Sequence, residues 1–343
     1  MLVALSGGVD SSVAALLLVE EGLDVVGVFM RNGVRGEGAA TRSCCSAADA
    51  RDAAAVADRL GIPFYSIDYE REFGALVDRF AAEYRHGRTP NPCVLCNQDL
   101  KFGHLLSLAR SLGAGSVATG HYARVRDGRL LRARDRAKDQ TYYLFGMARE
   151  ALPNVRFPLG DLTKTQVRER ARQAGLATAE KAESMEICFV PSGDYRDVLR
   201  ARGGMGRPGR FVDEDGRELG RHAGVGGYTV GQRRGLPALG APHYVKEIRA
   251  DRGEVVLCRR EGLRRRSARA SGMRWLVDPP GPEGLDVAVQ IRARSAPIPA
   301  RVVPVEGARR ATIRFDPPAA AVTPGQAAVL YAGEQVLGGG WLE

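Results

Sequence analysis

Short apolar runs alternate with amphipathic stretches of helical period through the first third of the chain. The pattern predicts, in order, a strand at Leu2–Leu5, a helix from Ser11, a strand at Val25–Phe29, a helix near Ala47–Leu60, a strand at Phe64–Ile67, helices at Glu70–Arg85 and Gln98–Leu112, and a strand at Ser116–Thr119. Strands separated by crossover helices are typical of an α/β protein with a doubly wound parallel sheet. Ligands bind such sheets at the carboxyl ends of the strands, where Ser6, Met30 and Gly120 fall.

The pattern changes after Tyr122. The dipeptide Asp127-Gly128 predicts a hairpin turn, and a helix is expected near Lys164–Ala174, followed by the short apolar run Met185–Val190. We interpret this stretch as a helical extension of the α/β domain, which we expect to cover residues 1–196.

A segment rich in Gly and Pro, Gly203–Gly209, precedes a part of the chain with a β-like pattern. Short strands are predicted at Arg210–Val212, Gly227–Val230, Tyr244–Ile248, Val287–Arg292, Ala300–Val305, Ala311–Phe315 and Ala327–Tyr331. We expect a small β-rich central domain at residues 197–262 and a C-terminal β-barrel at residues 263–343.

Composition narrows the class of protein. The 343 residues are 44% hydrophobic and 26% charged, which fits a folded multidomain protein and excludes intrinsic disorder. The apolar stretch Val13–Val19 is much shorter than the roughly 20 residues of a membrane span, and no basic segment precedes it. We therefore expect no signal peptide, no membrane anchor and a cytoplasmic location. Six cysteines are too few for a disulfide scaffold in a chain of this length.

The formal net charge of +10 favours a polyanionic partner, with nucleic acid the leading candidate. Basic side chains gain affinity for phosphates by releasing counterions. The alternative is that an arginine-rich composition reflects coding bias, because lysines are few.

The segment Ala4-Leu-Ser-Gly-Gly-Val-Asp-Ser-Ser12 joins the first predicted strand to the first helix. Its unpaired N–H groups, the helix dipole, the two glycines and the serine hydroxyls together suit a phosphate. The Gly-Lys-Ser/Thr of a Walker loop is missing, which disfavours γ-phosphoryl transfer. The segment resembles the loop of the PP-loop ATP pyrophosphatases, which holds pyrophosphate while AMP is transferred to an oxygen of the substrate. The alternative is an ordinary strand-to-helix turn. Asp10 is a candidate ligand of Mg²⁺.

Two cysteines, Cys93 and Cys96, lie in Thr89-Pro-Asn-Pro-Cys-Val-Leu-Cys-Asn97, which predicts a rigid loop running into the next helix. Cys96 then falls near a helix N-terminus, where the dipole favours a thiolate. The pair could be half of a zinc site, but no second Cys or His pair has matching spacing. A thioredoxin-like disulfide pair is also an alternative, although the nucleotide loop would then have no role. Cys188 alone would pass as a core cysteine, and Cys258 is interpreted as buried and inert.

The motifs taken together resemble the tRNA-specific 2-thiouridylase (MnmA) family. They are the nucleotide loop, Asn91-Pro-Cys-Val-Leu-Cys-Asn97, Gly120-His-Tyr-Ala-Arg124, Lys138-Asp-Gln-Thr-Tyr-Tyr-Leu144, Met185–Val190, Tyr228–Leu236 and Val322–Gln326. The resemblance covers essentially the whole chain. It implies that ATP, with Mg²⁺, adenylates the C2 oxygen of the wobble uridine in the tRNAs for lysine, glutamate and glutamine. A cysteine persulfide then supplies sulfur, giving 2-thiouridine, AMP and pyrophosphate. The implied partners are tRNA and a persulfide-donating cysteine desulfurase or sulfur-relay protein.

The same resemblance assigns roles by motif position. Cys96 matches the nucleophile and Cys188 the persulfide-bearing cysteine, and the two can form a disulfide as sulfur leaves. The matching ATP positions are Ala4, Leu5, Ser6, Gly7, Gly8, Val9, Asp10, Ser11, Met30 and Gly120. The positions matching contacts with the target base or tRNA are Asn91, Pro92, Cys93, His121, Lys138, Asp139, Gln140, Arg292 and Gln326. Loop capping is the alternative for His121, and a helix start for Asp139 and Gln140.

One departure from the family concerns Cys93, where some members carry an acidic residue thought to assist the nucleophile. With Cys93, Cys96 and Cys188 all present, three thiolates could instead ligate a four-iron four-sulfur cluster. A second departure is Arg292-Ala293, where relatives often have Arg-Tyr, so we expect no stacking contact there.

Two other functions remain open from the residues. A PP-loop amidotransferase or ligase would adenylate a small acid without needing Cys96 or Cys188. A non-catalytic RNA-binding protein would bind tRNA without turning over ATP.

Overall fold

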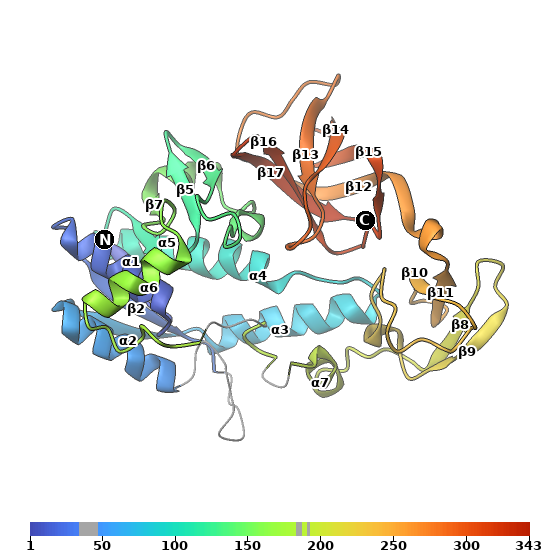
Figure 1. Ribbon diagram of the computed structural model, residues 1–343, viewed down its shortest axis with the longest axis horizontal. Helices are drawn as coiled ribbons and strands as arrows, with labels where there is room; N and C mark the ends of the chain where they lie inside the picture. The colour runs from blue at the N-terminus through green and yellow to red at the C-terminus, as the bar shows by residue number, and fades with distance from the viewer. Residues whose placement is uncertain (34–46, 183–186, 191–192) are drawn as a thin grey trace. The chain divides into compact units, whose positions relative to one another are not determined.

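The computed structural model of the protein describes residues 1–33, 47–182, 187–190 and 193–343. The chain forms two compact units. Unit 1 comprises Met1–Leu76, Cys93–Gly193 and Glu334–Val336, and unit 2 comprises Val77–Pro92, Asp194–Gly333 and Leu337–Glu343. Figure 1 shows the helices and strands of both units and labels most of them.

Unit 1 is built on a five-stranded sheet in the order β3-β2-β1-β4-β7. The strands are β1 (Leu2–Ala4), β2 (Val26–Arg31), β3 (Phe64–Asp68), β4 (Val117–Thr119) and β7 (Val155–Arg156), and all neighbouring pairs are parallel. The central strand β1 has Leu2 and Val3 buried, since parallel sheets are covered on both faces. The doubly wound parallel sheet predicted from the sequence is confirmed.

The helices of unit 1 pack around this sheet. They include α1 (Val9–Glu20), α2 (Ala47–Leu60), the first part of α3 (Glu70–Arg85) and α6 (Lys164–Gln173). One apolar cluster joins α1 and α2 to the sheet, and a second joins α1 to α6 through Val13 and Val167. Because α1 contributes to both clusters, its N-terminus and the loop before it are held from two sides.

A longer helix begins at Pro92 and carries a π-helical segment in its middle. Its parts are α4 (Pro92–Leu95), the π-helix η1 (Cys96–His104) and α5 (Leu105–Ser111). The Leu105 N–H donates to the Leu100 carbonyl, which is the five-residue spacing of a π-helix. The predicted loop up to Asn97 is therefore wrong. Pro92 is the first helical residue, a position where its missing N–H is not needed.

The predicted hairpin of unit 1 is confirmed. Strands β5 (Ala123–Arg126) and β6 (Arg129–Arg132) pair antiparallel. They turn at Asp127 and Gly128, both with positive φ (50° and 69°), as a tight hairpin turn requires.

In unit 2, helix α7 (Tyr195–Ala201) precedes a four-stranded sheet in the order β10-β11-β8-β9. Its strands are β8 (Gly209–Val212), β9 (Glu218–His222), β10 (Tyr244–Arg249) and β11 (Glu254–Cys258). Phe211, Val245 and Val255 lie in its core. The strand predicted at Gly227–Val230 is wrong, because Val225–Gly227 form a 3-10 turn (η4) and no strand follows directly.

The last part of unit 2 is a barrel, as predicted. Its order is β12 (Arg264–Trp275), β15 (Arg310–Ala320), β14 (Ile298–Val305), β13 (Leu285–Gln290), β16 (Ala327–Ala332) and β17 (Gln335–Leu342). Strand β12 also pairs antiparallel with β17, which closes the sheet. Val289, Val302, Ile313 and Leu330 fill the interior. The arginine-rich stretch Arg264–Arg266 opens β12 and is exposed.

Candidate functional site

The loop between β1 and α1 is shaped by its own serine hydroxyls. The Ser6 N–H donates to Ser11 Oγ at 3.1 Å, and Ser11 Oγ donates to the Gly8 carbonyl at 3.0 Å. Ser12 Oγ donates to the same carbonyl at 2.9 Å. These bonds fix the turn at the start of α1, where helix N–H groups and the dipole attract an anion.

Two glycines let other backbone segments approach this loop closely. Gly7 has φ +69°, and a Cβ there would lie 2.3 Å from the Asp49 carbonyl oxygen. A Cβ on Gly120 would lie 2.7 Å from both the carbonyl carbon of Asp10 and the Ser11 nitrogen. Glycine is therefore required both within the loop and at the end of β4 beside it.

Two side chains after α6 hold the loop and were missed by the sequence reasoning. Thr178 Oγ1 donates to Ser12 Oγ at 3.0 Å. Lys181 Nζ donates to the Gly7 carbonyl at 2.8 Å and to Asp49 Oδ1 at 2.6 Å, and it also contacts Asp52. Burial lowers the pKa of Lys181, but its hydrogen bonds with the two aspartates outweigh burial and raise that pKa overall. No local motif marks these residues, because their partners lie far away in the sequence.

The carboxylate of Asp10 is neutralised by a lysine that the sequence also did not reveal. Lys164 Nζ lies 2.7 Å from Oδ1 and 2.8 Å from Oδ2, and the Tyr122 hydroxyl donates to Oδ1 at 2.8 Å. For Asp10 to bind Mg²⁺ as expected, Lys164 would have to release it. The arrangement does not fit a carboxylate prepared for a metal, so the phosphates of ATP would supply most oxygen ligands of such an ion.

A cavity of about 260 Å³ opens at the carboxyl ends of the strands in unit 1. The residues lining it are Ala4, Leu5, Ser6, Asp10, Ser11, Val28, Phe29, Met30, Asn32, Tyr69, Phe73, Cys96, Leu100, Lys101, Thr119, Gly120, His121, Gln140 and Cys188. The structure thus brings most predicted ATP positions together with both predicted sulfur-carrying cysteines. Gly7, Gly8 and Val9 belong to the same loop without lining the cavity.

The two cavity cysteines come from different elements of unit 1. Cys96 begins the π-helix η1, and Cys188 follows the part of the Met185–Val190 run that lies outside the described residues. The next residue, Phe189, is buried and packs edge-on against Phe73 of α3, with ring centroids 5.8 Å apart. This ring contact fixes the chain at Cys188 against α3.

The described residues do not fit an iron–sulfur cluster. Cys93 is half-buried but does not line the cavity that Cys96 and Cys188 share. In the parts of the chain that the structure describes, no three Cys, His, Asp or Glu side chains gather as metal ligands. We therefore derive no chemistry through a cluster. Cys44 and Cys45 lie outside the described residues.

His121 is buried at the cavity beside Gly120. Its Nδ1 lies 2.7 Å from Thr119 Oγ1, and its ring packs against Phe102 and Phe157. Burial, helped by the positive charge of Lys101, lowers the pKa of His121 well below its ordinary value. The imidazole is therefore neutral at physiological pH and presents one N–H and one lone pair.

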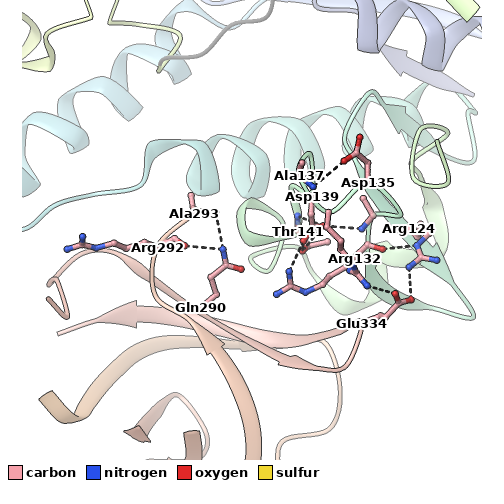
Figure 2. A network of polar contacts seen from close by, with 12 residues as sticks. Arg124, Arg132, Asp135, Ala137, Asp139, Thr141, Gln290, Arg292, Ala293 and Glu334 are labelled. Carbon is pink, nitrogen blue, oxygen red and sulfur yellow. Dashed lines mark hydrogen bonds and ion pairs between the residues drawn. The ribbon is translucent and has the colours of Figure 1, made fainter. Parts of the chain in front are cut away.

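The three residues Lys138, Asp139 and Gln140 make different contacts, and of the three Gln140 lines the cavity. Gln140 Oε1 accepts a hydrogen bond of 2.8 Å from the Tyr122 N–H. Asp139 instead accepts hydrogen bonds from Arg132, the Ala133 N–H and Thr141, as Figure 2 shows for Arg132 and Thr141. Asp139 thereby holds the start of the 3-10 helix η2 (Thr141–Tyr143). Lys138 donates its N–H to the Asp135 carbonyl.

The remaining predicted tRNA positions lie in unit 2. Arg292 donates to the carbonyls of Val230 and Ala321 and to Thr323, at 2.9 to 3.0 Å. Gln290 donates to the carbonyls of Arg292 and Ala293 (Figure 2). The guanidinium of Arg292 is thus held in place by hydrogen bonds to other residues of unit 2.

Gln326 and Asn91 also lie in unit 2. Gln326 Nε2 donates to the Thr89 carbonyl at 2.9 Å. Asn91 is buried, and Pro92 follows it as the last residue of that segment of the unit. These side chains order the segment that leads to the cysteine-bearing helix.

Comparisons with known proteins cover the whole chain. Residues 1–192 match the family model described as "tRNA methyl transferase HUP domain", residues 196–259 the "tRNA methyl transferase PRC-barrel domain", and residues 265–342 the "Aminomethyltransferase beta-barrel domain". The chain is 47% identical to the tRNA-specific 2-thiouridylase MnmA of Geobacter metallireducens, covering 100% of this chain and 96% of that protein. It is 48% identical to the MnmA of Geotalea uraniireducens, covering 100% and 94%.

Among the described residues, no helix combines the length and the apolar character needed to cross a membrane.

Proposed function

Because the chain belongs to the tRNA-specific 2-thiouridylase (MnmA) family, and is thus a tRNA sulfurtransferase on an ATP-using PP-loop domain, we propose that it 2-thiolates the wobble uridine of tRNA. The substrates are the tRNAs for lysine, glutamate and glutamine. One observation carries the proposal: the nucleotide loop, Cys96 and Cys188 line the same cavity.

The first step is adenylation. The C2 oxygen of uridine is a poor leaving group, and transfer of AMP to it, with loss of pyrophosphate, makes it a good one. The loop at Ser6–Ser12 receives the phosphates through its N–H groups and hydroxyls. Met30 and Gly120 line the same cavity and border the nucleotide.

The second step is sulfur transfer. The terminal sulfur of a persulfide on Cys188 attacks C2, and AMP leaves with the former C2 oxygen. The Cys96 thiolate then attacks Sγ of Cys188, which releases the thiocarbonyl of 2-thiouridine and forms a Cys96–Cys188 disulfide. An external thiol must reduce that disulfide before the next turnover. A cysteine desulfurase or sulfur-relay protein supplies the persulfide.

His121 and Gln140 suit contacts with the target base, because both are polar and line the cavity. A neutral imidazole can donate or accept one hydrogen bond with the uracil edge. The segment Asn91–Cys93 and the anchored Arg292 and Gln326 are proposed to shape the tRNA surface rather than to react.

The decisive experiment combines unmodified tRNA, ATP, Mg²⁺ and a persulfide donor, followed by nucleoside mass spectrometry and measurement of AMP and pyrophosphate. We expect 2-thiouridine from the wild type and from Cys258→Ser, since Cys258 is buried in unit 2 and does not line the cavity. Cys96→Ser and Cys188→Ser should lose 2-thiouridine while still releasing pyrophosphate when tRNA is added. Full thiolation by either variant would reject the cysteine mechanism. Pyrophosphate release with a small acid in place of tRNA would favour a ligase.

A further inference from the structure

The π-helical segment changes which residues share a face with Cys96. In an α-helix the fifth residue after Cys96 would point about 140° away from it, because each residue turns the helix by about 100°. The wider turn of η1, shown by the Leu105-to-Leu100 hydrogen bond, brings that residue back to nearly the same face. Accordingly, Cys96, Leu100 and Lys101 all line the cavity.

The charges around the cavity make Lys101 distinctive. Among the lining residues that the structure describes, the charged side chains are Asp10 and Lys101, since His121 is neutral. Asp10 is already neutralised by Lys164, which is not a lining residue. Lys101 and the N-terminus of α1 therefore both bring positive charge to the cavity.

We propose that Lys101 is a further substrate-binding residue, whose ammonium contacts the α-phosphoryl group of ATP while AMP is transferred to the tRNA. This rests on the proposed function. The nucleotide loop at α1 takes the leaving pyrophosphate, and the α-phosphorus must face the base that the sulfur will attack. Lys101 lies on the helix face of Cys96, so its charge is placed where the adenylated oxygen and the sulfur meet.

Lys101 makes no covalent bond in this step. The bond from the α-phosphorus to the bridging oxygen of pyrophosphate breaks, and a bond from that phosphorus to the uridine C2 oxygen forms. Negative charge on the non-bridging oxygens of the α-phosphorus is stabilised by the ammonium. After transfer the same contact holds the phosphate of the AMP leaving group.

The test compares binding of AMP and of adenosine by equilibrium dialysis, without tRNA. We expect Lys101→Met to weaken AMP binding by about tenfold or more while adenosine binding stays within about twofold, because a charged hydrogen bond to phosphate is lost. Lys101→Arg should restore most of the AMP affinity. Lys246→Met, on β10 in unit 2, is the matched control and should behave as the wild type. Equal losses for AMP and adenosine would show a structural role, and no loss for either would overturn the contact.

A second readout separates this inference from the proposed function. In a single turnover with tRNA, Lys101→Met should release pyrophosphate about a hundredfold more slowly than wild type, with Lys101→Arg intermediate. If the wild type releases no pyrophosphate but the AMP preference still depends on Lys101, the phosphate contact stands and the proposed function fails. If the wild type is active and Lys101→Met equals it in both assays, the inference fails alone.

Discussion

The ammonium of Lys164 lies within hydrogen-bonding distance of both carboxylate oxygens of Asp10, at 2.7 and 2.8 Å. Lys164 is the first residue of α6, and Thr163 begins that helix with a capping box completed by Gln166. The cap fixes where the helix starts and therefore where Lys164 points. In consequence the nucleotide loop offers its N–H groups and hydroxyls to phosphate without a net negative charge beside them.

Replacing Lys164 by Met should weaken ATP binding. The change leaves the Asp10 carboxylate uncompensated at a site for a polyanion, and we expect the Kd for ATP to rise about tenfold or more. Calorimetry at low and high salt measures the effect, which should shrink as salt screens the repulsion. The double variant Asp10→Asn/Lys164→Met should recover most of the affinity, because the repelling charge is gone. Unchanged affinity in the single variant would contradict the electrostatic role.

Gly120→Ala should displace the nucleotide loop. The new Cβ would lie 2.7 Å from backbone atoms of Asp10 and Ser11, which cannot move aside as a flexible side chain can. We expect a loss of about 1–3 kcal/mol in the free energy of unfolding and a strong loss of ATP binding. Gly115→Ala is the matched control, since an added Cβ at Gly115 would meet no atom of the described residues within 4 Å, and should change stability by less than about 1 kcal/mol. Denaturant unfolding and ATP titration of both variants decide the matter.

The sheet of unit 1 was predictable because its signal is local. The run Leu2–Leu5 is apolar throughout, as a strand buried on both faces must be, and the glycine-rich loop after it marks the switch to a helix. Once strands are parallel, their carboxyl ends share one edge. The meeting of Ser6, Met30 and Gly120 at one cavity therefore follows from topology.

The parts that sequence reasoning missed depend on contacts between distant residues. Lys164 forms an ion pair with Asp10, and Lys181 forms one with Asp49. Each lysine lies far from its aspartate in the chain, so the sequence alone does not reveal the pairing. The helix that carries the π-helical segment begins where a proline-rich string suggested a loop, because Pro92 serves as its first helical residue. In unit 2 the strand β12 was missed, since its exposed arginines interrupt the alternation of a typical strand.

His121 should make stability depend on pH. Its folded pKa is lowered, so between that pKa and the ordinary value of about 6.5 the unfolded chain binds more protons than the folded one. The free energy of unfolding should accordingly rise with pH through this window and fall as pH drops below 6.5. We expect His121→Asn to reduce the slope between pH 7 and pH 5 without abolishing it, because burial also lowers the pKa of His222. Exposed His86→Asn serves as the control in parallel urea titrations, and an unaltered slope in His121→Asn would refute the assignment.

Lys181→Met should destabilise unit 1 and the nucleotide loop together. Asp49 is buried, and without the ammonium its carboxylate loses a partner at 2.6 Å, while the Gly7 carbonyl loses one at 2.8 Å. We expect a loss of about 2 kcal/mol in the free energy of unfolding, less than for a fully buried pair because Lys181 is partly exposed. Lys181→Arg should retain part of this stability, and Lys181→Met/Asp49→Asn should recover stability by removing the carboxylate charge that has lost its ammonium. Since the pKa of Lys181 is raised, the contribution is complete at neutral pH and is lost as pH rises from the ordinary lysine pKa through the folded one. A double variant no more stable than Lys181→Met would show that the charge pair is not what holds this loop.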